Sequence, residues 1–217
     1  MEPFVKHRGR IAVLDWTDVN TDLIIPARYL KRVERIGYGP LLFADKRYAP
    51  GTAPEPDSPE QHGPDLPEFP LNDPRARGAE ILVAGRNFGC GSSREHAVWA
   101  VAQGGYRVVI TPGKGEGFAD IFEGNAYNNG LLPLEVEPEL WRKIADLGHG
   151  AEVTIDLENL SLTIHDGSES VHAIDVPEEQ RTRLLQGLDA VGETLVFEAD
   201  IRAHEQAMPA WLATRPA

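Results

Sequence analysis

The chain has 217 residues, of which 41% are hydrophobic and 25% are charged, values typical of a globular protein with one core. Lys and Arg number 21 against 34 for Asp and Glu, which gives a net charge of −13. An acidic surface repels phosphate backbones and anionic lipid, so the composition disfavours nucleic acids and membrane surfaces as partners. We therefore expect a single domain over residues 1–217 that binds neither.

Cys90 is the only cysteine, which excludes an internal disulfide and a four-thiolate zinc or iron–sulfur site built from this chain alone. The first residues lack the apolar stretch of a secretory signal. No apolar run approaches the ~20 residues of a membrane helix. We expect a cytoplasmic protein in a reducing compartment.

The first third of the chain contains few regular elements. Residues 10–14 form a predicted strand, and Asn20, Thr21 and Asp22 after it are typical of a turn or a helix cap. Eight prolines lie between residues 50 and 74. Such a segment cannot form a helix or an inner strand, so residues 50–78 are predicted to be a proline-rich excursion over the surface.

Strand and helix patterns alternate in the middle of the chain. Residues 81–84 are a continuous apolar run, typical of a buried strand, and residues 92–103 are predicted to form a helix that starts with the capping-box pattern Ser92-x-x-Glu95. The pattern continues with strands at 107–111 and 131–136 and helices at 118–127 and 139–147. This alternation predicts a parallel or mixed sheet.

The last third has a different pattern. Apolar and polar residues alternate over 153–157 and 160–164, which predicts a hairpin with one solvated face. The remaining predicted elements are a strand at 171–176 and C-terminal helices within 178–217, at about 178–188 and 198–212. The predicted fold class is α/β, with a mixed sheet and an added antiparallel hairpin.

The segment from Gly85 to His96 contains the most informative chemistry. Its three glycines leave backbone N–H groups accessible after the predicted strand. Ser92 and Ser93 stand at the predicted helix start, where the helix dipole and free amides favour an anion. Arg94 in the first turn opposes that dipole unless an anion, such as a substrate carboxylate, lies between them.

A simpler interpretation of the same segment stays open. Ser92 then only caps the helix, the glycines only form turns, and Arg94 pairs with an acidic loop. Two hydroxyls, an arginine and three glycines converge here, and this convergence favours a ligand site.

Several other kinds of site are not indicated by the sequence. The dinucleotide fingerprint, the P-loop and the serine hydrolase elbow are absent. The seven histidines lack metal-ligand spacing, so no metal site is predicted in this chain. Cys90 is interpreted as a packed thiol, with a low-pKa nucleophile at the helix start as the alternative.

Three stretches resemble the signatures of one family. They are N-T-D-L-I-I-P-A-R-Y-L from Asn20, N-F-G-C-G-S-S-R-E-H-A from Asn87, and F-A-D-I-F-x-x-N-x-x-N-N-x-L-L-P from Phe118. Over nearly its whole length the chain is similar to the small subunits of 3-isopropylmalate dehydratase (isopropylmalate isomerase), which correspond to the swivelling domain of aconitase. The pattern G-L-D-x-x-G-x-T-L from Gly187 fits a stand-alone small subunit rather than the fused domain.

This resemblance implies a swivelling β/β/α fold and a hydro-lyase that is active only with a separate large subunit, in a heterodimer or larger assembly. The large subunit would hold a 4Fe–4S cluster, and this chain alone would bind no cofactor, in agreement with its single cysteine. The implied reaction is dehydration of 2-isopropylmalate to 2-isopropylmaleate and rehydration to 3-isopropylmalate, a step of leucine biosynthesis.

The motif positions also imply residue roles. Ser92 would be the base that removes the proton α to a carboxylate, and Arg94 would bind a substrate carboxylate. The residues implied to bind or orient the substrate are Ser93, Asp22, Thr21, Lys31, Arg32 and Val33. The last three belong to a loop that the family associates with selection of the substrate side chain.

Related functions stay open at this point. Small subunits of homoaconitase, citraconate hydratase or maleate hydratase would use the same motifs, and a non-catalytic anion-binding module would keep the fold. Asn20 stands where relatives commonly have an acidic residue, which softens the local electrostatics. Intact Ser92 and Arg94 favour a catalytic subunit over the binding module.

Overall fold

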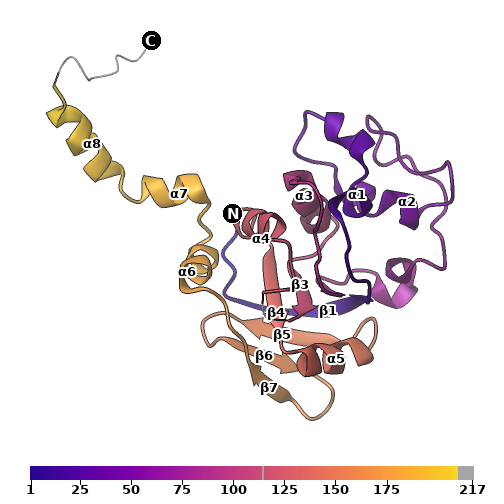
Figure 1. Cartoon of the computed structure of the whole chain (residues 1–217). Coiled ribbons are helices and arrows are strands. Elements are labelled where there is room, and N and C mark those ends of the chain that lie inside the picture. The colour runs from indigo at the N-terminus through magenta and orange to yellow at the C-terminus, as the bar shows by residue number, and fades with distance from the viewer. Residues whose placement is uncertain (114, 210–217) are drawn as a thin grey trace.

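A seven-stranded mixed sheet with the order β4-β3-β2-β1-β5-β6-β7 forms the centre of the computed structural model, which describes residues 1–113 and 115–209 (Figure 1). Four strands run parallel to one another, and antiparallel strands extend the sheet beyond β1. The parallel strands are β1 (Lys6–Leu14), β2 (Ile81–Ala84), β3 (Val108–Pro112) and β4 (Leu132–Val136). The predicted mixed sheet is confirmed.

The parallel strands are buried on both faces, because helices cover each side of this half of the sheet. In β2, Leu82 and Ala84 face one hydrophobic cluster, whereas Ile81 and Val83 face the other. A strand buried on both faces is a continuous apolar run, and the prediction of a strand at 81–84 is confirmed residue for residue.

The antiparallel half of the sheet is joined to the parallel half through the long strand β1. The first half of β1 pairs with β5 (Glu152–Asp156), and its second half pairs with β2. Strands β6 (Ser161–Ile164) and β7 (Ser170–Ala173) complete the sheet. The predicted hairpin is therefore confirmed as β5 and β6.

The prediction of one solvated face is wrong for β5, where the polar residues Thr154 and Asp156 are buried. Asn159 donates two hydrogen bonds to the Asp156 carboxylate, and Lys6 Nζ lies 3.2 Å from it. These partners hold the pKa of Asp156 below its ordinary value and offset the cost of burying the carboxylate.

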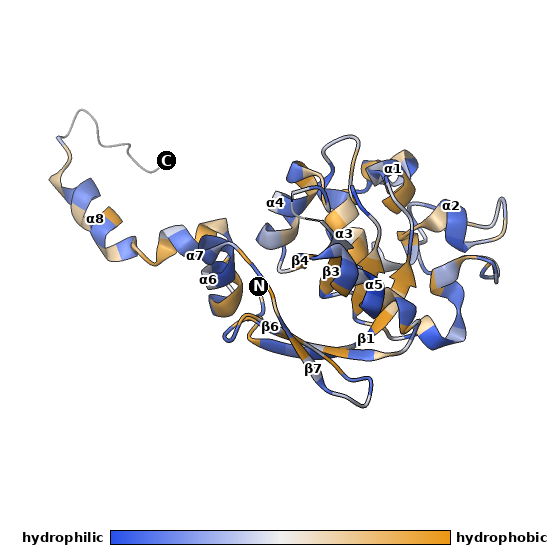
Figure 2. Ribbon diagram, turned by 60° about the horizontal axis from the view of Figure 1, so that its bottom comes forward, coloured by the Kyte–Doolittle hydropathy of each residue, from blue (hydrophilic) through white to orange (hydrophobic). Residues whose placement is uncertain are grey.

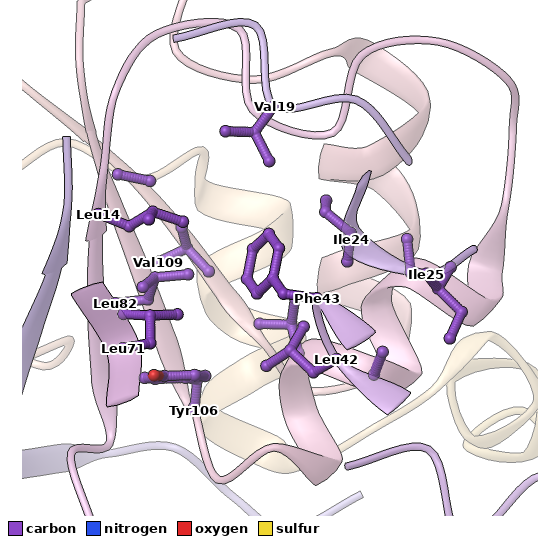
Figure 3. Packing of buried hydrophobic residues seen from close by; sticks show 14 of the residues in the cluster. Leu14, Val19, Ile24, Ile25, Leu42, Phe43, Leu71, Leu82, Tyr106 and Val109 are labelled. Carbon is purple, nitrogen blue, oxygen red and sulfur yellow. The ribbon is translucent and has the colours of Figure 1, made fainter. Parts of the chain in front are cut away.

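Helices α1 to α4 lie on one face of the sheet and α5 on the other. Their bounds are α1 (Thr21–Ile24), α2 (Ala44–Arg47), α3 (Glu95–Gln103), α4 (Asp120–Asn128) and α5 (Pro138–Asp146). Figure 3 shows the packing on the first face, where Leu42 and Phe43 lie between Leu82 and Val109 of the sheet and Ile24 of α1.

The proline-rich residues 50–78 contain no long element, only 3₁₀ turns at Pro70–Asn72 and Pro74–Ala76. This segment nevertheless contributes to the core, because Phe69 and Leu71 are buried in the same cluster as the helices. Part of the predicted surface excursion thus covers apolar surface that the short helices α1 and α2 leave open.

The chain continues into α6 (Glu178–Gln186), α7 (Ala190–Leu195) and α8 (Glu198–Ala207). Helices α7 and α8 stand away from the sheet (Figures 1 and 2) and expose Val191, Leu195, Val196, Phe197 and Ile201. The sequence did not predict α7, and the predicted extension of the last helix to residue 212 includes 210–212, outside the described residues. Within 1–113 and 115–209, no helix has the length and apolar character needed to cross a bilayer.

Candidate active site at the carboxyl edge of the parallel strands

The loops that follow β1, β2 and β3 meet at one edge of the sheet. Asn20 forms a parallel bridge with Cys90, and Phe88 forms another with Phe118. These bridges join three loops that are far apart in sequence. Because ligands of open α/β sheets bind beyond the carboxyl ends of the parallel strands, this edge is the expected place for a site.

A cavity of about 200 Å³ opens at this edge and is lined by Thr21, Ser92, Ser93 and Arg94. Asp22 joins the group through an ion pair with Arg94. The cavity is smaller than the roughly 300–1,000 Å³ typical of pockets for drug-sized ligands. Its small size, and the hydroxyl and guanidinium groups in its wall, suit a small organic acid.

The sequence interpretation missed the wall of the cavity that α4 provides. Ala119, Asp120, Ile121 and Phe122, at the beginning of that helix, complete the lining. They belong to the third signature stretch, so the motif itself was the signal that would have placed them at the site.

The glycines of the loop after β2 are required by its backbone and its packing. Gly89 has a φ of +78° and Gly91 has a φ of +95°, in the region that residues with a Cβ avoid. A Cβ on Gly89 would also overlap the ring of Phe122. The loop therefore passes directly against α4, and only glycine fits at position 89.

We expect the substitution Gly89→Ala to lower the free energy of unfolding by roughly 2–5 kcal/mol, from backbone strain together with overpacking against Phe122. Urea denaturation measures this loss. The matched control is Gly51→Ala, since Gly51 has a φ of +77° and open space where a Cβ would lie. Equal destabilisation by the two substitutions would contradict the proposed contact with Phe122.

Helix α3 begins at Glu95, not at Ser92, so the predicted capping box is wrong. The N-cap is Arg94, whose backbone is extended and whose side chain makes no capping hydrogen bond. Glu95 does not reach back to the loop; its Oε1 accepts a hydrogen bond of 3.0 Å from Asn129 Nδ2. Because the hydroxyl of Ser92 caps no amide of α3, it is available at the cavity, where Ser92 is exposed.

Thr21 fixes the backbone of Ser92 across the cavity. Asn20 caps α1 by accepting a hydrogen bond from the backbone of Leu23, which places Thr21 in the first turn of that helix. The buried Thr21 side chain donates through Oγ1 to the Ser92 carbonyl at 2.9 Å, and its N–H donates to the Cys90 carbonyl at 2.8 Å. The Thr21 hydroxyl is thus engaged in positioning the loop.

Arg94 and Asp22 form an ion pair through Nη1 and Oδ1. This contact is the acidic pairing of Arg94 that the simpler interpretation expected. The Arg94 side chain is only 14% exposed, whereas that of Asp22 is 54% exposed. Asp22 engages one edge of the guanidinium, so the edge formed by Nε and Nη2 is available for a carboxylate.

The predicted selection residues Lys31, Arg32 and Val33 do not line this cavity. Lys31 and Val33 are exposed, the latter by 92%. Arg32 instead donates hydrogen bonds to the carbonyls of Pro56 and Ile36. The structure therefore brings Thr21, Asp22, Ser92, Ser93 and Arg94 together and leaves the other three on a separate loop.

Two ionisable groups in the same segment as Ser92 and Arg94, Cys90 and His96, have pKa values shifted by burial. Burial raises the pKa of the Cys90 thiol, with a smaller contribution from Asp18, so a reactive thiolate is disfavoured. Burial lowers the pKa of His96, which is therefore neutral at pH 7. Among the described residues, no group of three or more His, Cys, Asp or Glu side chains is placed to hold a metal ion.

Comparison with known proteins places this site in a family. Residues 1–139 match the aconitase C-terminal domain. The 3-isopropylmalate dehydratase small subunits of Bacillus pumilus and Shewanella amazonensis are 43% and 45% identical to the chain, over 98% and 97% of its length and 99% of theirs.

A solved structure gives the same result. The crystal structure of 3-isopropylmalate dehydratase from Methanocaldococcus jannaschii superposes with a TM-score of 0.62 at 27% identity, covering 93% of this chain and 99% of that one. This likeness confirms the expected swivel-domain fold. The chain belongs to the aconitase C-terminal domain family, in the group of 3-isopropylmalate dehydratase small subunits.

Proposed function

We propose that this chain is the small subunit of a hydro-lyase that converts 2-isopropylmalate to 3-isopropylmalate through 2-isopropylmaleate, in leucine biosynthesis. The observation that carries the proposal is the cavity where Ser92, Ser93 and Arg94 meet, with Asp22 paired to Arg94. The chain is also more than 40% identical, over nearly its full length, to the 3-isopropylmalate dehydratase small subunits of two bacteria.

In this proposal Ser92 is the base of the dehydration. Its Oγ takes the proton from the carbon α to a carboxylate, while hydroxide leaves the neighbouring carbon and the double bond of 2-isopropylmaleate forms between them. Rehydration with the opposite regiochemistry returns the proton and gives 3-isopropylmalate. The base is the Ser92 alkoxide, because a neutral serine hydroxyl is too weak to take this proton. The positive potential of the first amides of α3 and of Arg94 stabilises that alkoxide.

Arg94 holds the substrate carboxylate in place. Its Nε and Nη2 form a planar fork that matches the two oxygens of a carboxylate. Asp22 keeps the guanidinium oriented from the other side, and Ser93 adds a hydroxyl at the cavity wall. Thr21 acts through the backbone of Ser92 rather than on the substrate.

A partner chain supplies the remaining chemistry. We assign a 4Fe–4S cluster to a large subunit, because this chain has one cysteine and its described residues form no metal site. When bound in the complex, that cluster supplies a Lewis acid for the departing hydroxyl. The assembly is a heterodimer or a larger complex of the cytoplasm.

Anaerobic affinity purification of this chain from its own cells tests the proposal. We expect a larger partner with the broad visible absorbance of an iron–sulfur cluster, and a complex that hydrates 2-isopropylmaleate faster than citraconate or maleate. Faster turnover of citraconate, maleate or homoaconitate would assign the chain to a related hydro-lyase. A colourless chain recovered alone would instead favour an anion-binding module.

A further inference from the structure

We propose that Asn129, the C-cap residue of α4, is a positioning residue that anchors the beginning of α3 and thereby places Arg94 at the cavity. The anchoring follows from contacts within this chain alone. Its effect on substrate binding rests on the proposed function, because it acts through the binding of a carboxylate by Arg94.

The side-chain amide of Asn129 joins α4 to α3. Nδ2 donates to Glu95 Oε1 at 3.0 Å and to the Asn125 carbonyl at 2.8 Å, and Oδ1 accepts from Trp99 Nε1 at 3.0 Å. A carboxylate only accepts and an indole only donates, so these partners determine the orientation of the amide. Glu95 and Trp99 are four residues apart and lie on the same face of α3. One side chain therefore binds two successive turns of the neighbouring helix.

The beginning of α3 lacks the usual side-chain cap. Its N-cap residue, Arg94, makes no capping hydrogen bond and instead pairs with Asp22. A capping side chain ordinarily bonds to the first free amides and stabilises the first turn. Here the first residue of the helix, Glu95, is held from outside by Asn129. Because Arg94 directly precedes Glu95, the anchored turn determines where the backbone of Arg94 lies.

Helix α4 contacts the segment that carries Ser92 and Arg94 on both sides of these residues. Before them, Gly89 lies against Phe122, whose ring is also 5.2 Å from that of Phe88. After them, Glu95 is bonded to Asn129. Residues 90–94 therefore span two points that are both held by α4.

Ser92 is positioned by other contacts. Thr21 of α1 donates through Oγ1 to the Ser92 carbonyl at 2.9 Å and through its backbone N–H to the Cys90 carbonyl at 2.8 Å. These bonds do not involve Asn129, so they remain when Asn129 is changed. Loss of the bond between Asn129 and Glu95 should therefore displace Arg94 more than Ser92, and should change KM more than kcat.

The test compares Asn129→Asp, alone and combined with Glu95→Gln, with the control Asn128→Asp. In Asn129→Asp the donor becomes an oxygen that faces the Glu95 carboxylate, so this bond is lost. Adding Glu95→Gln supplies a donor again, from the opposite side of the pair. Asn128 is the adjacent amide of α4, is exposed, and accepts from Arg183 Nη1 at 2.9 Å, a bond that an aspartate keeps.

Amide hydrogen exchange of the free chain measures the anchoring directly. We expect exchange of peptides covering 95–100 to become about 2- to 10-fold faster in Asn129→Asp, the effect of one lost hydrogen bond. It should return toward the wild-type rate in the double variant and stay unchanged in Asn128→Asp. Glu95→Ala removes the same bond at an exposed position, where no packing is lost, and should accelerate exchange by a similar factor.

Kinetics of the assembled enzyme test the link to Arg94. We expect Asn129→Asp to raise KM for 2-isopropylmaleate about 2- to 10-fold and to leave kcat within about twofold of the wild type. Glu95→Gln in the same chain should offset most of the rise in KM. A role of Asn129 in folding alone would instead give a loss of activity that Glu95→Gln does not repair.

Unchanged exchange of residues 95–100 in both Asn129→Asp and Glu95→Ala would overturn the anchoring role whatever the activity shows. Faster exchange with an unchanged KM, or a rise in KM that Glu95→Gln leaves in place, would overturn the link to Arg94. A wild-type complex that fails to hydrate 2-isopropylmaleate would overturn the proposed function and the effect on KM derived from it. Faster exchange that Glu95→Gln reverses would still support Asn129 as the anchor of α3.

Discussion

The substitution Ser92→Ala is expected to lower kcat of the assembled enzyme roughly 10²–10⁴-fold, the usual contribution of a positioned general base. KM should change little, because Arg94 still binds the carboxylate. Ser92 is exposed and its hydroxyl caps no amide of α3, so the variant should fold and assemble normally. Steady-state kinetics with 2-isopropylmalate measure the effect, and gel filtration with the large subunit checks assembly.

Ser93→Ala is the matched control for this substitution. Ser93 is the adjacent exposed hydroxyl on the same cavity wall, and its proposed role is to position the substrate. Its loss should raise KM modestly and leave kcat within about tenfold of the wild type. Near-normal turnover by Ser92→Ala, or equal loss of kcat in both variants, would remove Ser92 from the role of base.

The second large effect is expected for Arg94→Lys, which should raise KM about 10- to 100-fold. A lysine ammonium keeps the charge but cannot reproduce the planar fork, and one charge-assisted hydrogen bond contributes about 1.5–3 kcal/mol. The shorter reach of lysine also weakens the contact with Asp22 that orients the arginine in this structure. The measurement is KM and kcat for 2-isopropylmaleate at saturating large subunit.

Arg86→Lys provides the control for Arg94→Lys. Arg86 also pairs with a carboxylate, at 3.5 Å from Glu116, but its side chain is largely exposed and outside the cavity. Exposed ion pairs contribute little, so this variant should behave like the wild type. An unchanged KM in Arg94→Lys would contradict carboxylate binding by Arg94.

The elements that the sequence predicted best are those whose pattern reflects burial on both sides. The run at 81–84 became β2 with the predicted bounds. Both faces of this strand are buried, so all four of its residues are apolar and the run is easy to identify in the sequence. The start of α3 was misplaced for a different reason. Thr21, about seventy positions earlier, donates a hydrogen bond to the Ser92 carbonyl, and Asn129 donates one to the Glu95 carboxylate. Local pattern reasoning cannot detect such long-range partners.

The candidate site, too, was predicted in its residues but not in its long-range contacts. The motif identified Ser92, Arg94 and Asp22, but their meeting depends on β1 and β2 being neighbours in the sheet, which the order of residues does not reveal. Phe122 belongs to the third signature stretch, which signalled its place at the site, but its contact with Gly89 forms only after α4 is placed. Lys31 and Val33 lie on a separate exposed loop, since Arg32 is bonded away from the cavity to Pro56 and Ile36.

The most direct measurement is the hydration rate of 2-isopropylmaleate by the purified large subunit under anaerobic conditions, alone and with increasing amounts of this chain. The conjugated double bond of 2-isopropylmaleate absorbs in the ultraviolet, so its disappearance follows the reaction. If the chain completes the active site, the rate rises from background and saturates at a fixed stoichiometry, and the Ser92→Ala chain gives almost no rise. A rate independent of the chain, or an equal rise with Ser92→Ala, would contradict its role as the catalytic small subunit.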